Sequence, residues 1–268
     1  MRIALVQLAY GDDEPTAARI ERAAELVAQQ RGHDLVVLPE LWAPTGFDYG
    51  RWDGEAEPLD GPLAAAMADA ARAAGATLHA GSFVERLPEP GADGNTLSNT
   101  SLVLSADGER VALYRKVHRF GFGAGEPRLM EAGEDVVVVD LPDGAGGTVR
   151  TGLSTCYDLR FPELYRRQQE AGASLLVVPA AWPLARVAHW TLLGRARAVE
   201  DQCVMVQVNT GGTHARTPMG GHSQVVAATG EVLGELAHTD EAVLSVEVDL
   251  AATAAYREAF PVLADRRL

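Results

Sequence analysis

Short apolar segments alternate with longer amphipathic segments along the whole chain, and this alternation limits the possible folds more than any other feature. The apolar segments are four to eight residues long and rich in Val, Ile and Leu. Segments of this kind predict strands that are buried on both faces. They cover residues 3–8, 34–38, 77–84, 101–104, 136–141, 149–154, 174–178, 203–208, 223–227 and 242–248.

The segments between these strands predict helices, because they contain good helix formers and apolar residues at a spacing of three to four. The predicted helices cover residues 16–30, 63–74, 162–170 and 186–201. Hairpin turns are expected at residues 106–108 and 228–230, where Asp-Gly and Thr-Gly steps supply positive φ angles. The fold class is therefore α/β with mixed sheets, and the two halves of the chain could form two facing sheets with helices outside.

The charge of the chain disfavours a nucleic-acid partner. Its 268 residues carry a formal net charge of -14, whereas phosphate binding uses clustered Lys and Arg. No segment approaches the roughly 18 uninterrupted apolar residues of a transmembrane helix, and the opening segment is expected to be a strand rather than a signal peptide. We therefore expect a soluble, cytoplasmic protein with no membrane partner, whose two cysteines, Cys156 and Cys203, are free thiols.

Three reactive residues follow apolar segments directly. Glu40 follows DLVVLP, Lys116 follows VALYR and Cys156 follows TVRTGLST. Because open α/β sheets bind ligands beyond the carboxyl ends of their strands, the three side chains are expected to meet in one cleft. A thiol, a carboxylate and an ammonium together supply a nucleophile, a base and a cation for a developing oxyanion.

The segments around these residues resemble the nitrilase (carbon-nitrogen hydrolase) superfamily. The similar motifs are PELW around Glu40, YRKVH around Lys116 and CYDLRFPELYR around Cys156, with RARAVEDQ and GGHSQVVAATGEV further along the chain. The resemblance spans nearly the whole chain, and three motifs in the right order are highly specific. It implies one domain over residues 1–268, folded as a four-layer αββα sandwich of two mixed sheets flanked by helices.

The resemblance also implies a mechanism that requires neither a metal nor an organic cofactor. Cys156 would attack the amide carbon, Glu40 would transfer its proton to the departing ammonia, and water would release the acid from a thioester. Lys116 would stabilise the oxyanion with the backbone N–H of Tyr157. The family places a second glutamate near the triad, and Glu126 is the candidate, with Glu131 and Glu134 as alternatives.

The motif after the nucleophile resembles the branch of omega-amidases and deaminated-glutathione amidases, which implies hydrolysis of a small linear amide. Carbamoylase or nitrilase activity is the alternative within the superfamily. A papain-like protease using His118, His214 or His222 lacks the flanking motifs. A non-catalytic scaffold would be expected to have lost one member of the triad, and all three are present.

Several side chains are candidates for the pocket wall and for substrate binding. Phe47, Trp182 and Tyr157 are aromatic residues near the predicted cleft. An anionic substrate would need a cation, which Arg119, Arg128 or Arg186 could supply through a bidentate contact. The predicted site includes Arg128 as the substrate-binding arginine. The sequence alone gives no reason to prefer it over Arg119 or Arg186.

Neighbours of the predicted triad are expected to support it. Asp158 and Arg160 are predicted to form an ion pair that holds the turn after the nucleophile. His118 is predicted to make a supporting hydrogen bond rather than to act as the base. Cys203 lies in an apolar segment and is expected to be inert.

The helices at 162–170 and 186–201 carry more apolar residues than one face needs, among them Leu164, Tyr165, Trp190 and Leu193. This surplus, with the family's habit of stacking sheets across a two-fold axis, predicts a homodimer or a larger assembly of dimers.

Overall fold

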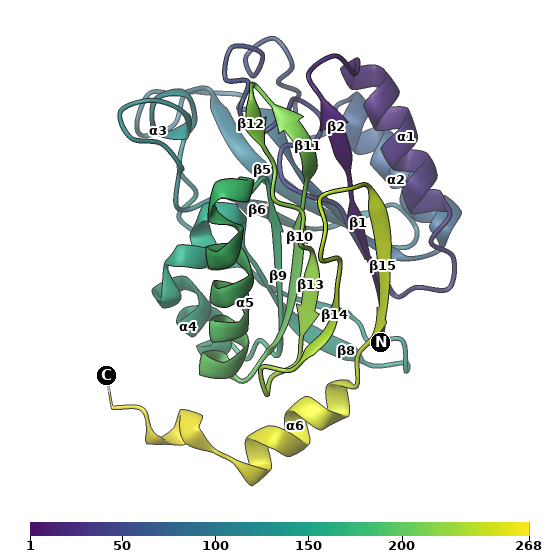
Figure 1. The fold of residues 1–268 in the computed structure, drawn as a ribbon, viewed down its shortest axis with the longest axis vertical. Coiled ribbons are helices and arrows are strands. Elements are labelled where there is room, and N and C mark those ends of the chain that lie inside the picture. The colour runs from purple at the N-terminus through teal and green to yellow at the C-terminus, as the bar shows by residue number, and fades with distance from the viewer. Residues whose placement is uncertain (268) are drawn as a thin grey trace.

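Two six-stranded mixed sheets form the centre of the protein, and helices cover their outer sides (Figure 1). The computed structural model describes residues 1–267. The first sheet has the order β15 (Ala242–Glu247), β1 (Arg2–Gln7), β3 (Leu35–Val37), β4 (Thr77–Arg86), β5 (Leu97–Leu104) and β6 (Arg110–Arg115). The second has the order β14 (Val232–Glu235), β13 (Gln224–Val226), β10 (Val204–Asn209), β9 (Leu175–Ala180), β8 (Thr148–Leu153) and β7 (Val138–Pro142).

The two sheets have the same internal plan. β1, β3 and β4 run parallel in the first sheet, as do β8, β9 and β10 in the second. Antiparallel strands flank each parallel set. The hairpins predicted at residues 106–108 and 228–230 connect β5 to β6 and β13 to β14. The predicted four-layer sandwich of mixed sheets is confirmed.

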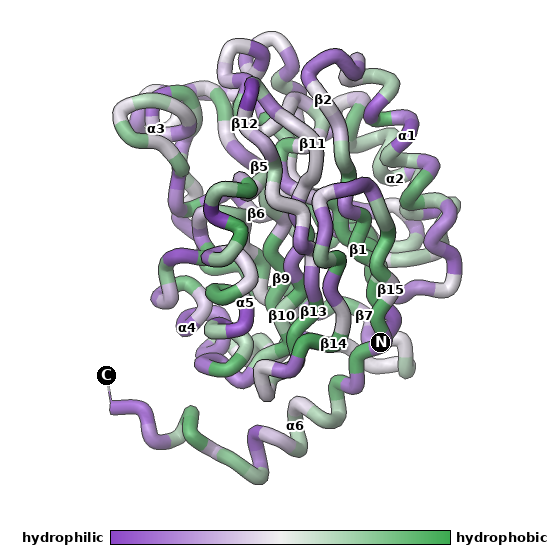
Figure 2. The backbone as a smooth tube through the Cα atoms, in the orientation of Figure 1, coloured by the Kyte–Doolittle hydropathy of each residue, from purple (hydrophilic) through white to green (hydrophobic). Residues whose placement is uncertain are grey.

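Side chains of the central strands alternate between two apolar layers, one between the two sheets and one between a sheet and its helices. In β1, Ile3 and Leu5 belong to the core between the sheets, while Ala4 and Val6 pack beneath α1 (Thr16–Ala28) and α2 (Pro62–Ala74). Successive strand residues point to opposite faces, so a strand covered on both sides must be apolar throughout. Figure 2 shows this as hydrophobic colour along the inner strands.

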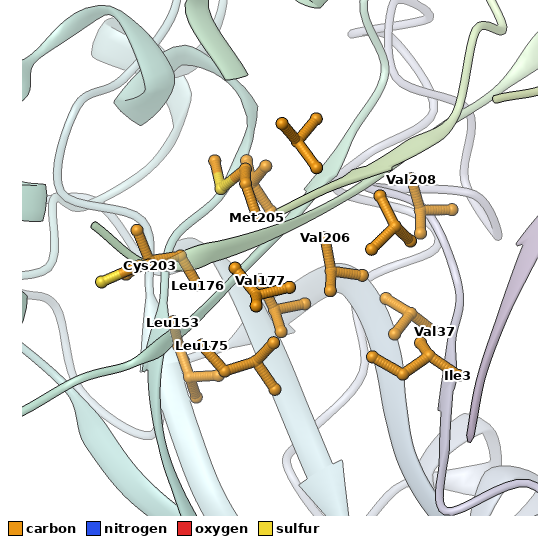
Figure 3. Packing of buried hydrophobic residues seen from close by; sticks show 14 of the residues in the cluster. Ile3, Val37, Leu153, Leu175, Leu176, Val177, Cys203, Met205, Val206 and Val208 are labelled. Carbon is orange, nitrogen blue, oxygen red and sulfur yellow. The ribbon is translucent and has the colours of Figure 1, made fainter. Parts of the chain in front are cut away.

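The core between the sheets consists mainly of branched aliphatic side chains. Ile3 and Val37 of the first sheet lie near Val206 and Val208 of the second (Figure 3), and all four are fully buried. Burial of each such side chain contributes about 1.5–3 kcal/mol. This core fixes the two sheets relative to each other and so brings together side chains that extend beyond their strand ends.

Helices α4 (Pro162–Glu170) and α5 (Val187–Asp201) cover the side of the protein opposite to α1 and α2 (Figure 1). Leu164, Tyr165 and Trp190 are buried in the chain's own core, and Leu193 packs against it. The inference of an interface from these residues was therefore wrong. The two helices pack on the sheet and on each other, which requires apolar residues on more than one stripe.

The sequence did not predict three smaller features. A third sheet joins β12 (Thr217–Pro218), β11 (Gly211–His214) and β2 (Ala9–Gly11). Two helices were also missed, α3 (Glu126–Leu129) and the mostly exposed α6 (Leu250–Ala259). No helix within residues 1–267 combines the length and apolar character that crossing a membrane would require.

Candidate active site

The three predicted reactive residues lie just beyond strand ends and line the same cavity. Glu40 follows β3, Lys116 follows β6 directly and Cys156 follows β8. Two of them come from the first sheet and one from the second, so the stacking of the sheets assembles the site. Glu40, Lys116 and Cys156 are all at least 92% buried.

The backbone at Glu40 is held by a bulge in the neighbouring strand. Gly81 in β4 has a φ of +66°, and a Cβ there would lie 1.9 Å from the carbonyl oxygen of Pro39. Only glycine allows this approach. Ser82 then donates its backbone N–H to Pro39, and its hydroxyl accepts from the N–H of Leu41, at 3.1 Å each. These contacts fix the backbone on both sides of Glu40.

Four buried polar side chains form one hydrogen-bonded network. Lys116 Nζ donates to Glu40 Oε1 at 2.7 Å and to the carboxylate of Glu126 at 2.9 Å. Asn99 Nδ2 donates to the same two carboxylates, at 2.8 Å for Glu40 and 2.7 Å for Glu126. The second oxygen of Glu40 accepts from the backbone N–H of Ala181 at 2.8 Å. Charge-assisted bonds of this kind hold the carboxylates in one orientation.

Glu126 is the acidic residue that the structure brings to the predicted triad. Its second oxygen accepts the backbone N–H of Phe120, which anchors the loop before α3. The alternatives lie elsewhere: Glu131 accepts the backbone N–H groups of Asp93 and Asn95, and Glu134 is exposed.

Cys156 adopts a left-handed backbone conformation, with a φ of 47°. It begins a 3₁₀ turn, Cys156–Arg160, whose start is held by reciprocal bonds between Thr155 and Asp158. A non-glycine residue in this region costs roughly 1–3 kcal/mol and occurs often at functional sites. The strained turn places the sulfur in the cavity that Glu40 also lines.

Asp158 does not form the predicted ion pair with Arg160. Its carboxylate accepts the hydroxyl of Tyr114 at 2.7 Å, the backbone N–H of His118 at 2.9 Å and the N–H of Thr155 at 2.8 Å. Positions i and i+2 of a 3₁₀ turn point in different directions, because the turn repeats every three residues. Asp158 therefore links the turn that Cys156 begins to the end of β6.

His118 makes the predicted supporting hydrogen bond. Its Nδ1 lies 2.8 Å from Asp158, and its ring stacks on Phe161 with centroids 3.8 Å apart. Cys203, just before β10, is fully buried, and burial raises the pKa of its thiol to about 12. Both cysteines are free thiols.

The electrostatics favour a protonated thiol next to a charged amine. Burial and the Glu40 carboxylate raise the pKa of Cys156 well above its usual range, against the influence of Lys116. Burial alone would lower the pKa of Lys116, but Glu126 and Glu40 outweigh it and raise that pKa well above its usual range. Burial also raises the pKa of Glu126, although Lys116 opposes this. A thiol in this state needs a base before it can act as a nucleophile.

The cavity is lined by aromatic side chains together with a few charged ones, a combination that is typical of small-molecule sites. Its wall includes the predicted aromatic residues Phe47, Tyr157 and Trp182. The sequence missed further wall residues, which are Leu41, Gly46, Tyr49, Trp52, Phe120, Arg160, Ala181 and Pro183.

Arg128, the predicted substrate-binding arginine, is exposed and does not line this cavity. It lies two positions after Glu126 on α3, and helical residues at this spacing face nearly opposite directions. Arg160 and Arg186 line the wall instead, and Arg119 bonds to the carbonyl of Met130. No three His, Cys, Asp or Glu side chains within residues 1–267 are grouped so that they could hold a metal.

Comparison with known proteins identifies related sequences and structures. The carbon-nitrogen hydrolase family model matches residues 2–258. A 2-oxoglutaramate amidase from Paenarthrobacter nicotinovorans is 43% identical over 99% of this chain and 89% of its own length. A 2-oxoglutaramate amidase from Bacillus subtilis (strain 168) is 34% identical over 92% of this chain and 91% of its own.

A solved structure has the same architecture. XC1258 from Xanthomonas campestris, described as a CN-hydrolase superfamily protein with an arsenic adduct in the active site, superposes with a TM-score of 0.86. The two chains are 30% identical, and the match covers 100% of this chain and 97% of that one.

Proposed function

Because this chain belongs to the carbon-nitrogen hydrolase family, we propose that it is an amidase in which Cys156 is the nucleophile, Glu40 the base and Lys116 the oxyanion-stabilising cation. One observation carries this proposal: Lys116 Nζ lies 2.7 Å from Glu40, and both residues line the same buried cavity as Cys156.

The first half of the reaction forms a thioester. Glu40 takes the proton of Cys156 as the sulfur attacks the amide carbon, and the carbonyl oxygen becomes an oxyanion. Lys116 and the backbone N–H of Tyr157 stabilise that charge. Glu40 then gives the proton to the amide nitrogen, the carbon–nitrogen bond breaks and ammonia leaves.

The second half releases the acid. Water enters the position that ammonia left, and Glu40 takes a proton from it as the oxygen attacks the thioester carbon. The carbon–sulfur bond breaks, and the proton returns to the Cys156 sulfur. Glu126 and Asn99 are positioning residues, because both bond to the groups that do this work. No step draws on a metal or an organic cofactor.

We propose 2-oxoglutaramate as the substrate, since both amidases compared above are named for it. Its amide would face Cys156, and its carboxylate would face Arg160, which lies on the cavity wall in the same turn. Phe47 and Trp182 would pack against the carbon chain between the two ends.

We further propose that the enzyme is cytoplasmic, that the chain folds as one domain and that it acts as a homodimer. The outer face of α5 supports a dimer, because Leu192 and Val199 are 64% and 47% exposed there. These residues lie seven positions apart and so share one helix face. A second copy of the chain would cover this apolar stripe.

The direct test is ammonia release from 2-oxoglutaramate, a carbamoyl amino acid and a nitrile, with Cys156→Ala and Cys203→Ala as matched variants. Turnover of the amide should fall by about 10⁴-fold or more in Cys156→Ala and persist in Cys203→Ala. Amide turnover that survives in Cys156→Ala would refute the assigned nucleophile, and preference for the carbamoyl compound or the nitrile would refute the amidase assignment.

A further inference from the structure

Two guanidinium groups reach the cavity from separate turns. Arg160 ends the turn after the nucleophile, and Arg186 ends the short 3₁₀ helix Leu184–Arg186. Arg160 lies over the ring of Trp182, 4.6 Å from its centroid, and Arg186 lies 5.7 Å from the centroid of Phe120. Both side chains are partly buried, and both line the same wall.

The charge balance of this wall is positive although the chain is strongly acidic. Its other charged residues are Glu40, Glu126 and Lys116, so three cations outnumber two carboxylates. Both carboxylates are already bonded to Lys116. An anionic ligand would therefore meet guanidinium groups whose charge no neighbouring carboxylate of the wall neutralises.

The two guanidinium groups are also close enough to affect each other. Partial burial and the charge of Arg186 together lower the pKa of Arg160. Arg160 has a weak polar contact, at 3.5 Å from Nδ1 of His189, and a histidine does not neutralise it as a carboxylate would. Two neighbouring guanidinium groups favour a ligand with two adjacent acceptor groups. They disfavour a ligand that carries a positive charge next to them.

We propose that Arg186 is a specificity-determining residue that selects amides with an uncharged oxygen acceptor beside the carboxylate and rejects those with an ammonium group there. The proposal rests on the amidase function argued above. While Arg160 faces the substrate carboxylate, Arg186 donates to the oxygen on the next carbon. In L-glutamine that carbon carries an ammonium, which cannot accept a hydrogen bond and would lie beside two guanidinium groups.

Four amides with the same five-carbon chain test this proposal. 2-Oxoglutaramate carries an oxo group beside the carboxylate, glutaramate carries two hydrogens there and L-glutamine carries an ammonium. Pentanamide lacks the carboxylate. Values of kcat and KM would be measured for the wild type, Arg186→Gln, Arg186→Lys and the control Arg128→Gln, whose side chain is exposed outside the cavity.

We expect Arg186→Gln to reduce the preference for 2-oxoglutaramate over L-glutamine, and over pentanamide, by about 10–100-fold, mainly through KM. Arg186→Lys should still reject L-glutamine, because it keeps the charge, but should lose part of the preference for the oxo group over glutaramate. Arg128→Gln should keep the wild-type preferences.

Two results would overturn the proposal. In the first, Arg186→Gln slows all four amides equally, which would indicate a structural role. In the second, the wild type hydrolyses pentanamide or L-glutamine with the same kcat/KM as 2-oxoglutaramate. Either result leaves the amidase function intact, whereas no turnover of any amide would remove the proposed function itself.

Discussion

The side-chain amide of Asn99 donates to Oε1 of Glu40 at 2.8 Å, in a fully buried position on β5. The same NH₂ group donates to Glu126 at 2.7 Å. Two carboxylates that share one site repel each other unless donors lie between them. Asn99 and Lys116 are these donors, so Asn99 holds the proposed base in place without carrying charge.

Replacing Asn99 with alanine should therefore impair catalysis more than stability. We expect kcat to fall by about 10–100-fold, which corresponds to about 1.4–2.8 kcal/mol of lost transition-state stabilisation. The measurement is steady-state amide hydrolysis, with the thermal unfolding midpoint determined in parallel.

Ser98→Ala is the matched control, since residue 98 lies on the same strand and points to the opposite face. The Ser98 hydroxyl is buried without a hydrogen-bond partner within residues 1–267. Unchanged kcat in Asn99→Ala would contradict the positioning role.

The sequence predicted Glu40, Lys116 and Cys156 as the candidate site because of their positions after apolar segments. A reactive polar residue directly after an apolar segment lies at the carboxyl end of a strand, and α/β sheets bind ligands beyond these ends. Asn99 could not be predicted in this way, because it lies within β5 and not after it. A polar residue within a strand is usually interpreted as facing solvent. An amide inside a strand of otherwise apolar and hydroxyl residues was the available signal.

Features that depend on the direction of side chains could not be predicted from spacing. The cavity includes Arg160 and excludes Arg128, although each lies close in sequence to a proposed catalytic or positioning residue. The third sheet was missed because β2 and β11 have only three and four residues, separated by most of the chain. Pairing at that separation depends on the packing of the two large sheets.

Glu126→Gln should shift the pH dependence of hydrolysis. Glu126 is one of two carboxylates that raise the pKa of Lys116 against the effect of burial, so removing its charge lowers that pKa. Lys116 must be protonated to stabilise an oxyanion, and it loses its proton as pH rises through its pKa. The alkaline limb of the kcat–pH profile should therefore move to lower pH, with a maximal kcat about 10–100-fold lower.

Glu131→Gln is the control for that profile. Its carboxylate is also buried, but it accepts the backbone N–H groups of Asp93 and Asn95 instead of contacting Lys116. An alkaline limb that stays in place in Glu126→Gln, or moves equally in Glu131→Gln, would argue against the proposed coupling.

Leu192→Glu should separate the proposed dimer. Leu192 and Val199 form the exposed apolar stripe on α5, and a carboxylate buried there without a partner would oppose association. Sedimentation at micromolar concentration should give a dimer for the wild type and a monomer for Leu192→Glu. Val111→Glu, on β6 and 44% exposed, should remain dimeric. A monomeric wild type would refute the proposal.

His214→Phe should make the protein less sensitive to acid. His214 is fully buried on β11 and stacks on Tyr10 with centroids 4.2 Å apart, and neither ring nitrogen has a partner within residues 1–267. Burial, and to a smaller extent Arg19, lowers its pKa from 6.5 to about 3. Burial similarly lowers the pKa of His79 to about 4.

The direction of the effect follows from proton binding in the two states. From pH 6.5 down to about 4, the unfolded chain protonates both histidines while the folded chain keeps them neutral, so stability falls as pH falls. Each histidine contributes about 1.4 kcal/mol per pH unit. Asp201 has the opposite effect on stability, because burial raises its pKa from 3.8 to about 6. As pH falls from about 6 to 3.8, the folded chain protonates Asp201 before the unfolded chain does, and this contribution increases stability.

Comparing variants isolates the contribution of His214, since Asp201 and His79 are common to all of them. Between pH 6.5 and pH 5, His214→Phe should lose about 2 kcal/mol less unfolding free energy than the wild type. Urea denaturation at the two pH values measures this difference, and phenylalanine retains the stacking on Tyr10. The exposed His238→Phe serves as control and should follow the wild type. Parallel pH dependence in His214→Phe and the wild type would mean that His214 is protonated in the folded protein, with a partner that stabilises its charge.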